Sequence, residues 1–317
     1  MTKGKILRTE IIFPLLIGLF LVYYSFKDTS IEEQKVIIES IKNADYKFII
    51  FSMLIGLMSH LLRAKRWQIL ISPLGFNLQL HNSIMTIFAG LLSNFGIPRS
   101  GEFLRASLVY YYERIPFEKN LGTIVAERII DVFILAMLVF VGVNSFDFLN
   151  VDKDFNLVKI SIYILLLLCF FVFIWGKLKY SFKNKIHRYI LNIKEGILSV
   201  FKIEKKLNFF IYTFTIWISY FLMLYIAKFS IVETFFLPIE AIFFSFVAGA
   251  IAMTLTNGGL GAYPLAISSV ITQYEVPYES AITFGWVVWT SQTLIVVIFG
   301  CLSFIFLPIL NKNNTLK

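Results

Sequence analysis

The sequence predicts an all-α protein that crosses a membrane several times. Of its 317 residues 58% are hydrophobic and only 15% are charged, whereas soluble proteins carry about 25% charged residues. Long uncharged runs recur along the chain, and a helix needs about 20 apolar residues to span a bilayer. A soluble globule of this size has too little interior for so much apolar surface. We therefore expect one membrane domain over residues 1–317.

The uncharged runs mark the expected membrane segments in chain order. The first run follows three basic residues, as a signal peptide does, but it lacks a small-residue cleavage site. We therefore expect residues 1–45 to form a retained signal-anchor helix and an outer amphipathic segment. Centre-placed charges are costly in a bilayer, so the runs without charges are the candidate spans. These runs are 11–26, 48–62, 132–146, 160–176, 207–227 and 280–311.

Residues 147–206 are expected to hold a connecting span and a cytoplasmic amphipathic helix. At least six Lys and Arg lie in 177–206, and Ile186, Ile190, Ile193 and Ile197 recur at helical spacing. Such a helix lies in the membrane interface and attracts anionic headgroups. A solvated loop with accidental periodicity is the alternative.

Two further segments predict helices that enter the membrane, break and turn back. The run 241–274 has 34 uncharged positions, about 51 Å as a straight helix, which is too long for one span. The run 83–98 is too short, at about 24 Å, and a second short apolar piece follows it. Gly and Pro interrupt both segments, so we expect re-entrant hairpins at 83–112 and 241–274. The residues expected at their tips and hinges are Asn94, Pro98, Gly101, Asn257, Gly258, Gly259, Gly261 and Pro264.

The two hairpins lie in similar sequence contexts at an offset of about 161 residues. Leu92-Ser93-Asn94 matches Leu255-Thr256-Asn257, and Arg114-Ile115-Pro116 matches Glu275-Val276-Pro277. We interpret 46–146 and 207–311 as two repeats, with chance similarity between loops as the alternative.

The distribution of charge predicts the orientation of these repeats. With both termini cytoplasmic, the cytoplasmic side receives 22 of the 29 Lys and Arg but 8 of the 20 Asp and Glu, as the positive-inside rule requires. The hairpins then enter from opposite sides, which makes the repeats inverted and predicts a transporter with a midplane site. The net charge of +9 follows from the same bias, so we expect no nucleic-acid partner.

Charged residues beside apolar sequence mark the candidate binding site. Ionisable groups in a membrane are usually paired and functional, and Glu102 and Arg105 are three apart, so they could pair on one helix face. We interpret the arginines as ligands for a lipid phosphate and the carboxylates as their balance. The alternative is that these pairs only fix the first hairpin to the next helix. The candidate headgroup residues are Arg99, Glu102, Arg105, Glu127, Arg128 and Asp131, and those expected at the membrane surface are Arg63, Arg66 and Trp67.

The pattern of these residues resembles the lysylphosphatidylglycerol synthase transmembrane-region family. The resemblance covers roughly residues 45–305 and implies a lipid-translocating domain with two facing re-entrant hairpins. It also implies substrates such as aminoacylated phospholipids or polyprenyl-phosphate lipids. Since the chain ends at Lys317, we expect a stand-alone member without the aminoacyl-transferase domain. The motifs that carry the resemblance are Arg66-Trp67, Pro73-Leu74-Gly75, Asn94, Pro98-Arg99, Gly101-Glu102, Arg105, Glu127-Arg128, Asp131 and Gly258-Gly259-Leu260-Gly261.

These observations favour a lipid flippase of the cytoplasmic membrane over two other classes. One is a non-transporting partner of a lipid-synthesising enzyme or glycosyltransferase, and the other is an intramembrane enzyme that uses the carboxylates near 99–131. His60, His81 and His187 lack partners at ligand spacing, and no phosphate-binding glycine loop occurs, so we expect no metal or cofactor and no enzyme activity. The expected partners are membrane lipids, together with a lipid-synthesising enzyme or a second copy of the chain.

Overall fold

The computed structural model describes residues 31–97, 99–145, 184–256 and 258–312. Within these ranges the regular elements are all helices, which confirms the all-α class. Short 3₁₀ turns follow several of them. The helices are α2 (Ile31–Asn43), α3 (Tyr46–Ile71), α4 (Leu80–Gly96), α5 (Ser100–Glu113), α6 (Phe117–Ser145), α8 (Asn184–Leu198), α9 (Lys206–Ala227), α10 (Ile239–Leu255), α11 (Ala262–Ile271) and α12 (Tyr278–Leu310).

Three helical segments are long and apolar enough to cross a membrane. They are Tyr46–Leu74, Lys206–Ser230 and Tyr278–Leu310, and they contain the predicted runs 48–62 and 207–227 and nearly all of 280–311. The predicted run 132–146 lies almost wholly in the second half of α6. The predicted runs 11–26 and 160–176 lie outside the described residues.

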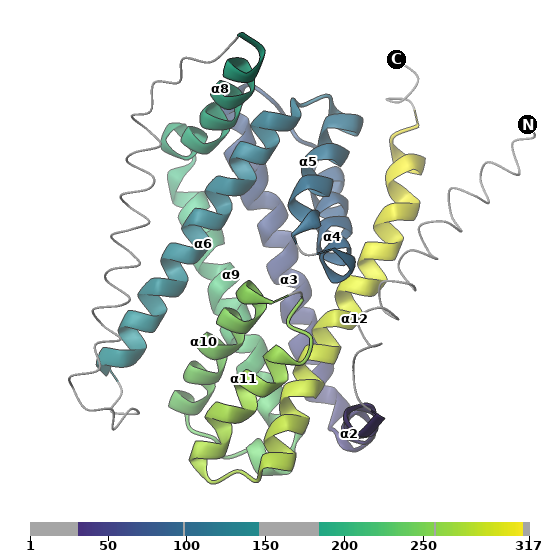
Figure 1. Ribbon diagram of the computed structural model, residues 1–317, viewed down its shortest axis with the longest axis vertical. Coiled ribbons are helices and arrows are strands. Elements are labelled where there is room, and N and C mark those ends of the chain that lie inside the picture. The colour runs from purple at the N-terminus through teal and green to yellow at the C-terminus, as the bar shows by residue number, and fades with distance from the viewer. Residues whose placement is uncertain (1–30, 98, 146–183, 257, 313–317) are drawn as a thin grey trace, which may run out of the picture.

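The long helices form a frame, and two short helical hairpins flank opposite halves of it. In Figure 1, α3, α9 and α12 run along most of the molecule, whereas α4 and α5 lie beside its upper half and α10 and α11 beside its lower half. The two hairpins therefore approach each other near the middle. Their tips make contact there, because a Cβ at Gly258 would lie 2.8 Å from the Phe95 ring.

The tip of the first hairpin is held by polar contacts between its two helices. Asn94 Oδ1 accepts a hydrogen bond of 2.8 Å from the N–H of Gly101, one of the backbone groups that the start of a helix leaves free. The hydroxyls of Ser93 and Ser100 are 2.6 Å apart. Pro98 lies outside the described residues.

The second hairpin turns on glycine. Gly258, Gly259 and Gly261 have φ of 64°, 72° and 68°, a left-handed conformation that glycine adopts without steric cost. Pro264 lies in the first turn of α11, where proline is tolerated because its missing N–H has no helical partner. Both predicted runs are thus broken, the first between Gly96 and Ser100 and the second between Leu255 and Ala262. Asn257 lies outside the described residues.

The same order of elements occurs twice in the chain. A long helix, a short helical hairpin and a second long helix make up α3–α6 and again α9–α12, with one 3₁₀ turn before the first hairpin and two before the second. Arg114 and Glu275 end the two hairpins with a left-handed φ of 58° and 63°. Each stands two residues before a proline, and the long helices then begin at Phe117 and Tyr278.

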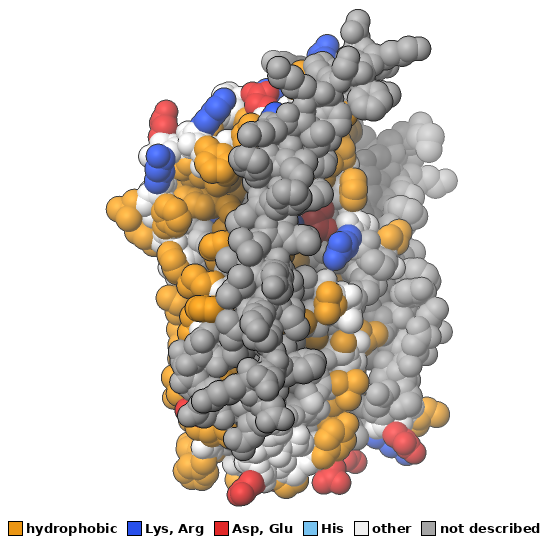
Figure 2. Space-filling view, turned by 60° about the vertical axis from the view of Figure 1, so that its left-hand side comes forward, with side chains coloured by type: hydrophobic (Ala, Val, Ile, Leu, Met, Phe, Trp, Pro, Cys, Tyr) orange, Lys and Arg blue, Asp and Glu red, His pale blue; other side chains and the backbone are white. Residues whose placement is uncertain are grey.

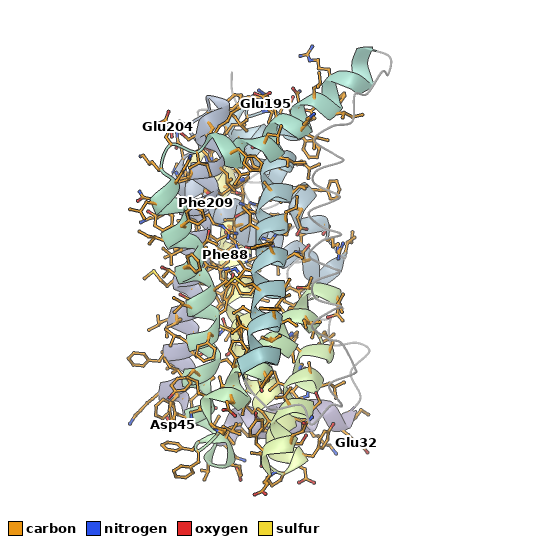
Figure 3. The ribbon with its side chains drawn as sticks, turned by 90° about the vertical axis from the view of Figure 1, so that its left-hand side faces the viewer. Glu32, Asp45, Phe88, Glu195, Glu204 and Phe209 are labelled. Carbon is orange, nitrogen blue, oxygen red and sulfur yellow. The ribbon has the colours of Figure 1, made fainter. Side chains whose placement is uncertain are left out.

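The surface of the bundle is apolar between two charged ends. Phe210, Phe214 and Ile218 of α9 are exposed, and Figure 2 shows hydrophobic side chains along much of the described surface. In Figure 3, Glu195 lies at one end of the molecule and Asp45 at the other, with Phe88 between them.

Helix α8 lies within the basic segment 177–206 and packs closely on α6. A Cβ at Gly196 would overlap the carbonyl oxygen of Lys119, and one at Gly122 would overlap that of Ile193. Lys119 and Glu195 form an ion pair of 2.9 Å across the same contact. The two helices are therefore held backbone to backbone.

Candidate functional site: a buried arginine network

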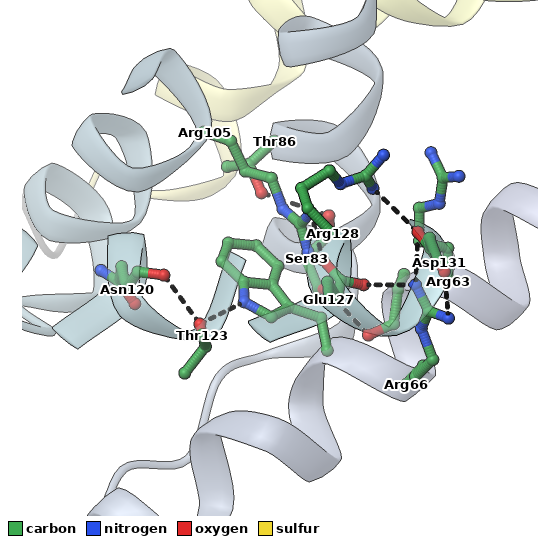
Figure 4. Close-up of polar contacts among 12 residues, drawn as sticks. Arg63, Arg66, Ser83, Thr86, Arg105, Asn120, Thr123, Glu127, Arg128 and Asp131 are labelled. Atoms are coloured by element: carbon green, nitrogen blue, oxygen red, sulfur yellow. Dashed lines mark hydrogen bonds and ion pairs between the residues drawn. The ribbon is translucent and has the colours of Figure 1, made fainter. Parts of the chain in front are cut away.

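Five charged side chains from three helices meet where these helices pack together (Figure 4), and among them only Arg128 is substantially exposed, at 41% of its side chain. We call this group the arginine network. Residues four apart on a helix share a face, and Glu127 and Asp131 both point from α6 toward Arg66 of α3. The members are Arg66 of α3, Arg105 of α5, and Glu127, Arg128 and Asp131 of α6.

Glu127 is the centre of the network and is bound by two arginines. Its Oε1 lies 3.2 Å from Nη2 of Arg66, and its Oε2 lies 2.7 Å from Nη1 of Arg105. The side chains of Glu127 and Arg66 are both fully buried. The carboxylate therefore joins α3, α5 and α6 at one point.

Asp131 continues the network one helical turn further along α6. Its two carboxylate oxygens lie 2.9 and 3.3 Å from Nη1 and Nη2 of Arg66. Its Oδ2 also lies 3.4 Å from Nη2 of Arg128. The two-point contact with Arg66 is the fork geometry that makes arginine–carboxylate pairs strong and directional.

An aromatic ring fixes the position of Arg105. The guanidinium carbon lies 3.5 Å from the centre of the Trp67 ring, a cation–π contact. The indole N–H of Trp67 in turn donates to Thr123 Oγ1 at 2.9 Å, and that hydroxyl donates to the carbonyl of Asn120 at 2.7 Å. Thr123 thus fixes the indole of Trp67, and Trp67 and Glu127 together fix Arg105.

The network carries one more positive charge than negative, and part of it is unpartnered. Three guanidinium groups face two carboxylates. The Nε and Nη2 atoms of Arg105 are buried and have no hydrogen-bond partner in the described structure. A buried charged donor without a partner is costly, so this free edge of Arg105 is suited to an anion. Within the described ranges, His, Cys, Asp and Glu do not gather in threes as a metal site requires.

The structure brings four of the six candidate headgroup residues together: Arg105, Glu127, Arg128 and Asp131. Arg99 is exposed at the start of α5 with a left-handed φ of 59°. The expected pairing of Glu102 with Arg105 is wrong, since Arg105 pairs with Glu127 instead. Glu102 forms no ion pair within the described residues, and its Oε2 is buried without a partner.

The expectation that Arg66 and Trp67 lie at the membrane surface is also wrong. Both are fully buried, and Arg66 is among the largest fully buried side chains of the protein. Arg63 is partly buried and donates to the hydroxyl of Tyr220 at 2.6 Å. An Arg-Trp pair after an apolar run is typical of an interface, but here α5 and α6 cover it. Thr123 and Asn120 had no distinguishing sequence signal.

The fold and the site define a class: a helical membrane protein with a charged network buried among its apolar helices. Residues 11–301 match the family described as lysylphosphatidylglycerol synthase TM region, and the chain belongs to this family. The chain is also similar to the UPF0104 membrane protein MJ1595 of Methanocaldococcus jannaschii, with 25% identity over 142 residues. That match spans 41% of this chain and 42% of the relative's length, less than half of each. No solved structure matches the chain significantly.

Proposed function

We propose that this protein moves a phosphate-bearing lipid across the cytoplasmic membrane, and that the arginine network binds the headgroup. The observation that carries the proposal is the free Nε and Nη2 edge of the buried Arg105. A guanidinium edge matches two oxygens of a phosphate, and a bound anion would balance the surplus positive charge of the network. Ionisable groups inside a membrane are rare, and substrate and ion paths are among the functions that they mark.

We propose in addition that the two hairpins re-enter the membrane from opposite sides and that the halves are inverted repeats. This is supported by the placement of the hairpins beside opposite halves of the frame (Figure 1) and by the contact of Gly258 with Phe95 at their tips. It is also supported by the matching left-handed turns at Arg114 and Glu275. Inverted repeats with broken helices put the substrate near the bilayer midplane.

The orientation that we propose has both termini in the cytoplasm. The end that carries α8 would then face the cytoplasm, in agreement with the basic residues of that segment. The second hairpin carries no charge between residues 241 and 274. In this proposal it contacts the acyl chains and gates access to the network.

Transport by reconstituted vesicles tests the function. The purified protein is placed in vesicles that contain a fluorescent phosphatidylglycerol, and a membrane-impermeant reductant reports how fast inner-leaflet lipid reaches the outer leaflet. We expect Arg105→Gln to slow this exchange about tenfold or more, since the lost interaction is a charge-assisted hydrogen bond in a buried site. The control is Lys65→Gln, which removes an exposed cation of α3.

Three outcomes would count against the proposal. Equal rates of lipid movement for the parent protein and Arg105→Gln would show that the network takes no part in transport. No lipid movement, together with co-purification of a lipid-modifying enzyme or glycosyltransferase, would favour a non-transporting partner. Chemical conversion of the lipid by the purified chain would indicate an enzyme.

A further inference from the structure

A line of polar side chains continues from the arginine network along one face of α3. Arg66, Arg63 and His60 follow one another at intervals of three residues, which keeps them on one side of the helix. Gly56 lies one turn beyond His60. The line from Arg66 to Gly56 covers about 15 Å at the rise of an α-helix. This length is about half of the ~30 Å hydrocarbon core of a bilayer.

Two members of this line have buried nitrogen atoms without partners. Arg63 donates from Nη2 to Tyr220, but its Nε has no partner in the described structure. The ring of His60 packs edge-on against Phe88 at 5.2 Å, and its Nδ1 is likewise buried without a partner. Unpartnered nitrogens therefore recur one turn apart along α3.

A glutamine from α12 completes the line. A Cβ at Gly56 would overlap Oε1 of Gln292, so the amide of Gln292 occupies the space that the missing side chain leaves on α3. The Nε2 atom of Gln292 is buried and has no partner in the described structure. The carboxamide thus contacts α3 one turn beyond His60.

The far end of the line reaches the tip of the second hairpin. Trp289 lies one turn before Gln292 on α12, and its indole N–H donates to the carbonyl of Gly258 at 2.8 Å. The polar line therefore connects the arginine network, beside the first hairpin, with the tip of the second.

We infer that Arg63, His60 and Gln292 form a second binding station for the phosphate of the lipid headgroup. We call these three residues the relay site. Each has a buried nitrogen that can donate a hydrogen bond and has no acceptor, and buried polar groups in proteins are otherwise almost always paired. Phosphate oxygens are acceptors of the kind that these nitrogens lack. The inference rests on the proposed function, since a headgroup would have to leave the network along a polar route.

The charges of the two stations agree with passage in steps. The network offers three guanidinium groups and two carboxylates, whereas the relay site offers one guanidinium and two neutral donors. Passage through a membrane requires sites that bind well enough to admit the substrate and weakly enough to release it. Each site thus carries one net positive charge, so an anion is attracted at both and can pass from one to the other.

Substitution by leucine tests the relay site, because leucine removes the polar atoms and still fills the space. The experiment compares the parent protein with His60→Leu, Gln292→Leu and the double variant in vesicles that contain fluorescent phosphatidylglycerol. We expect the double variant to move this lipid at about one tenth of the parental rate or more slowly. Its Tm is expected to stay equal or rise, since neither Nδ1 of His60 nor Nε2 of Gln292 loses a partner.

Two further measurements separate the relay site from the network and from packing. Phosphatidylglycerol retained by the purified protein in native mass spectrometry is expected to persist in the double variant and to be lost in Arg105→Gln. The control Gln79→Leu removes an exposed amide just before α4 that makes no capping hydrogen bond and should change neither rate nor Tm.

The outcomes distinguish this inference from the proposed function. A parental rate in the double variant overturns the relay site while Arg105→Gln still reports on the network. A fall in Tm that accompanies the loss of rate assigns His60 and Gln292 to packing and also overturns it. No lipid movement by the parent protein overturns the proposed function and the relay site together.

Discussion

Asn82 and Asn311 lie 229 positions apart in the chain and exchange two amide hydrogen bonds, of 2.9 and 2.7 Å. Both are buried. Asn82, in the first turn of α4, also donates to Glu113 of α5 at 2.7 Å. The end of the last long helix is therefore fixed to the base of the first hairpin, and the first and second halves of the chain are joined there.

This amide pair is expected to stabilise the bundle. Either Asn82→Ala or Asn311→Ala leaves a buried amide without its partner, which costs about 1–3 kcal/mol. In the double variant we expect the two losses to be less than additive, by about 0.5–3 kcal/mol. The free energy of unfolding, measured by SDS titration in mixed micelles, checks this. Asn43→Ala, exposed at the end of α2, is the control, and strictly additive losses would contradict the coupling.

Glu127 is expected to be the most sensitive member of the arginine network for stability. In Glu127→Gln the side chain keeps its shape but loses its charge, so Arg66 and Arg105 lose their shared counter-ion. Removing one partner of a buried ion pair costs about 3–5 kcal/mol. The same unfolding titration measures the effect, with the exposed Glu279→Gln as the matched control. A loss no larger than that of the control would show that the network contributes no stability.

The sequence predicted the helices far better than it predicted the partners of the charged residues. Uncharged runs are a property of single segments, so the long helices over 48–62 and 207–227 could be located from composition alone. Glu102 and Arg105 show the limit. Spacing on one helix brought them to a common face, but Arg105 is held by Trp67 of α3 and Glu127 of α6, and no local pattern reports which helix packs opposite.

The burial of Arg66 also could not be predicted from the local sequence. A basic residue after an apolar run is expected at the interface, where its charge stays in water. Its burial depends on Glu127 and Asp131, which lie more than 60 positions away in the chain and supply two counter-charges. The hairpin breaks were predictable because Gly and Pro act locally, and the contact between the two tips was not.

The close approach of the two helices of the first hairpin depends on glycine at position 101. A Cβ there would overlap the carbonyl oxygen of Gly90, which is backbone and cannot rotate away. Gly101→Ala is therefore expected to separate α4 from α5 and to cost about 1–3 kcal/mol or more. Because Arg105 lies one turn further along α5, lipid movement in vesicles should fall as well.

A second glycine provides the comparison for Gly101. At Gly142 a Cβ would meet the ring of Phe243 at 2.9 Å, and a side chain can move. Gly142→Ala should therefore cost less than Gly101→Ala in the same SDS titration. Equal losses would mean that the contact between Gly90 and Gly101 is not what holds the hairpin together.

The hydrogen bond between Trp289 and the tip of the second hairpin can be removed with little change in shape. Trp289→Phe keeps an aromatic ring against Phe95, which packs on Trp289 at 6.3 Å, but removes the indole donor to Gly258. The left-handed glycines 258, 259 and 261 then lose a fixed point, so the backbone of this tip should open more often. Hydrogen–deuterium exchange of the peptide over 256–264 is expected to become faster, while exchange in α9 stays unchanged. Trp217→Phe is the control, since its indole nitrogen has no partner in the described structure. If Trp289→Phe leaves exchange at the tip unchanged, the glycine turn is rigid by itself and the hydrogen bond does not position it.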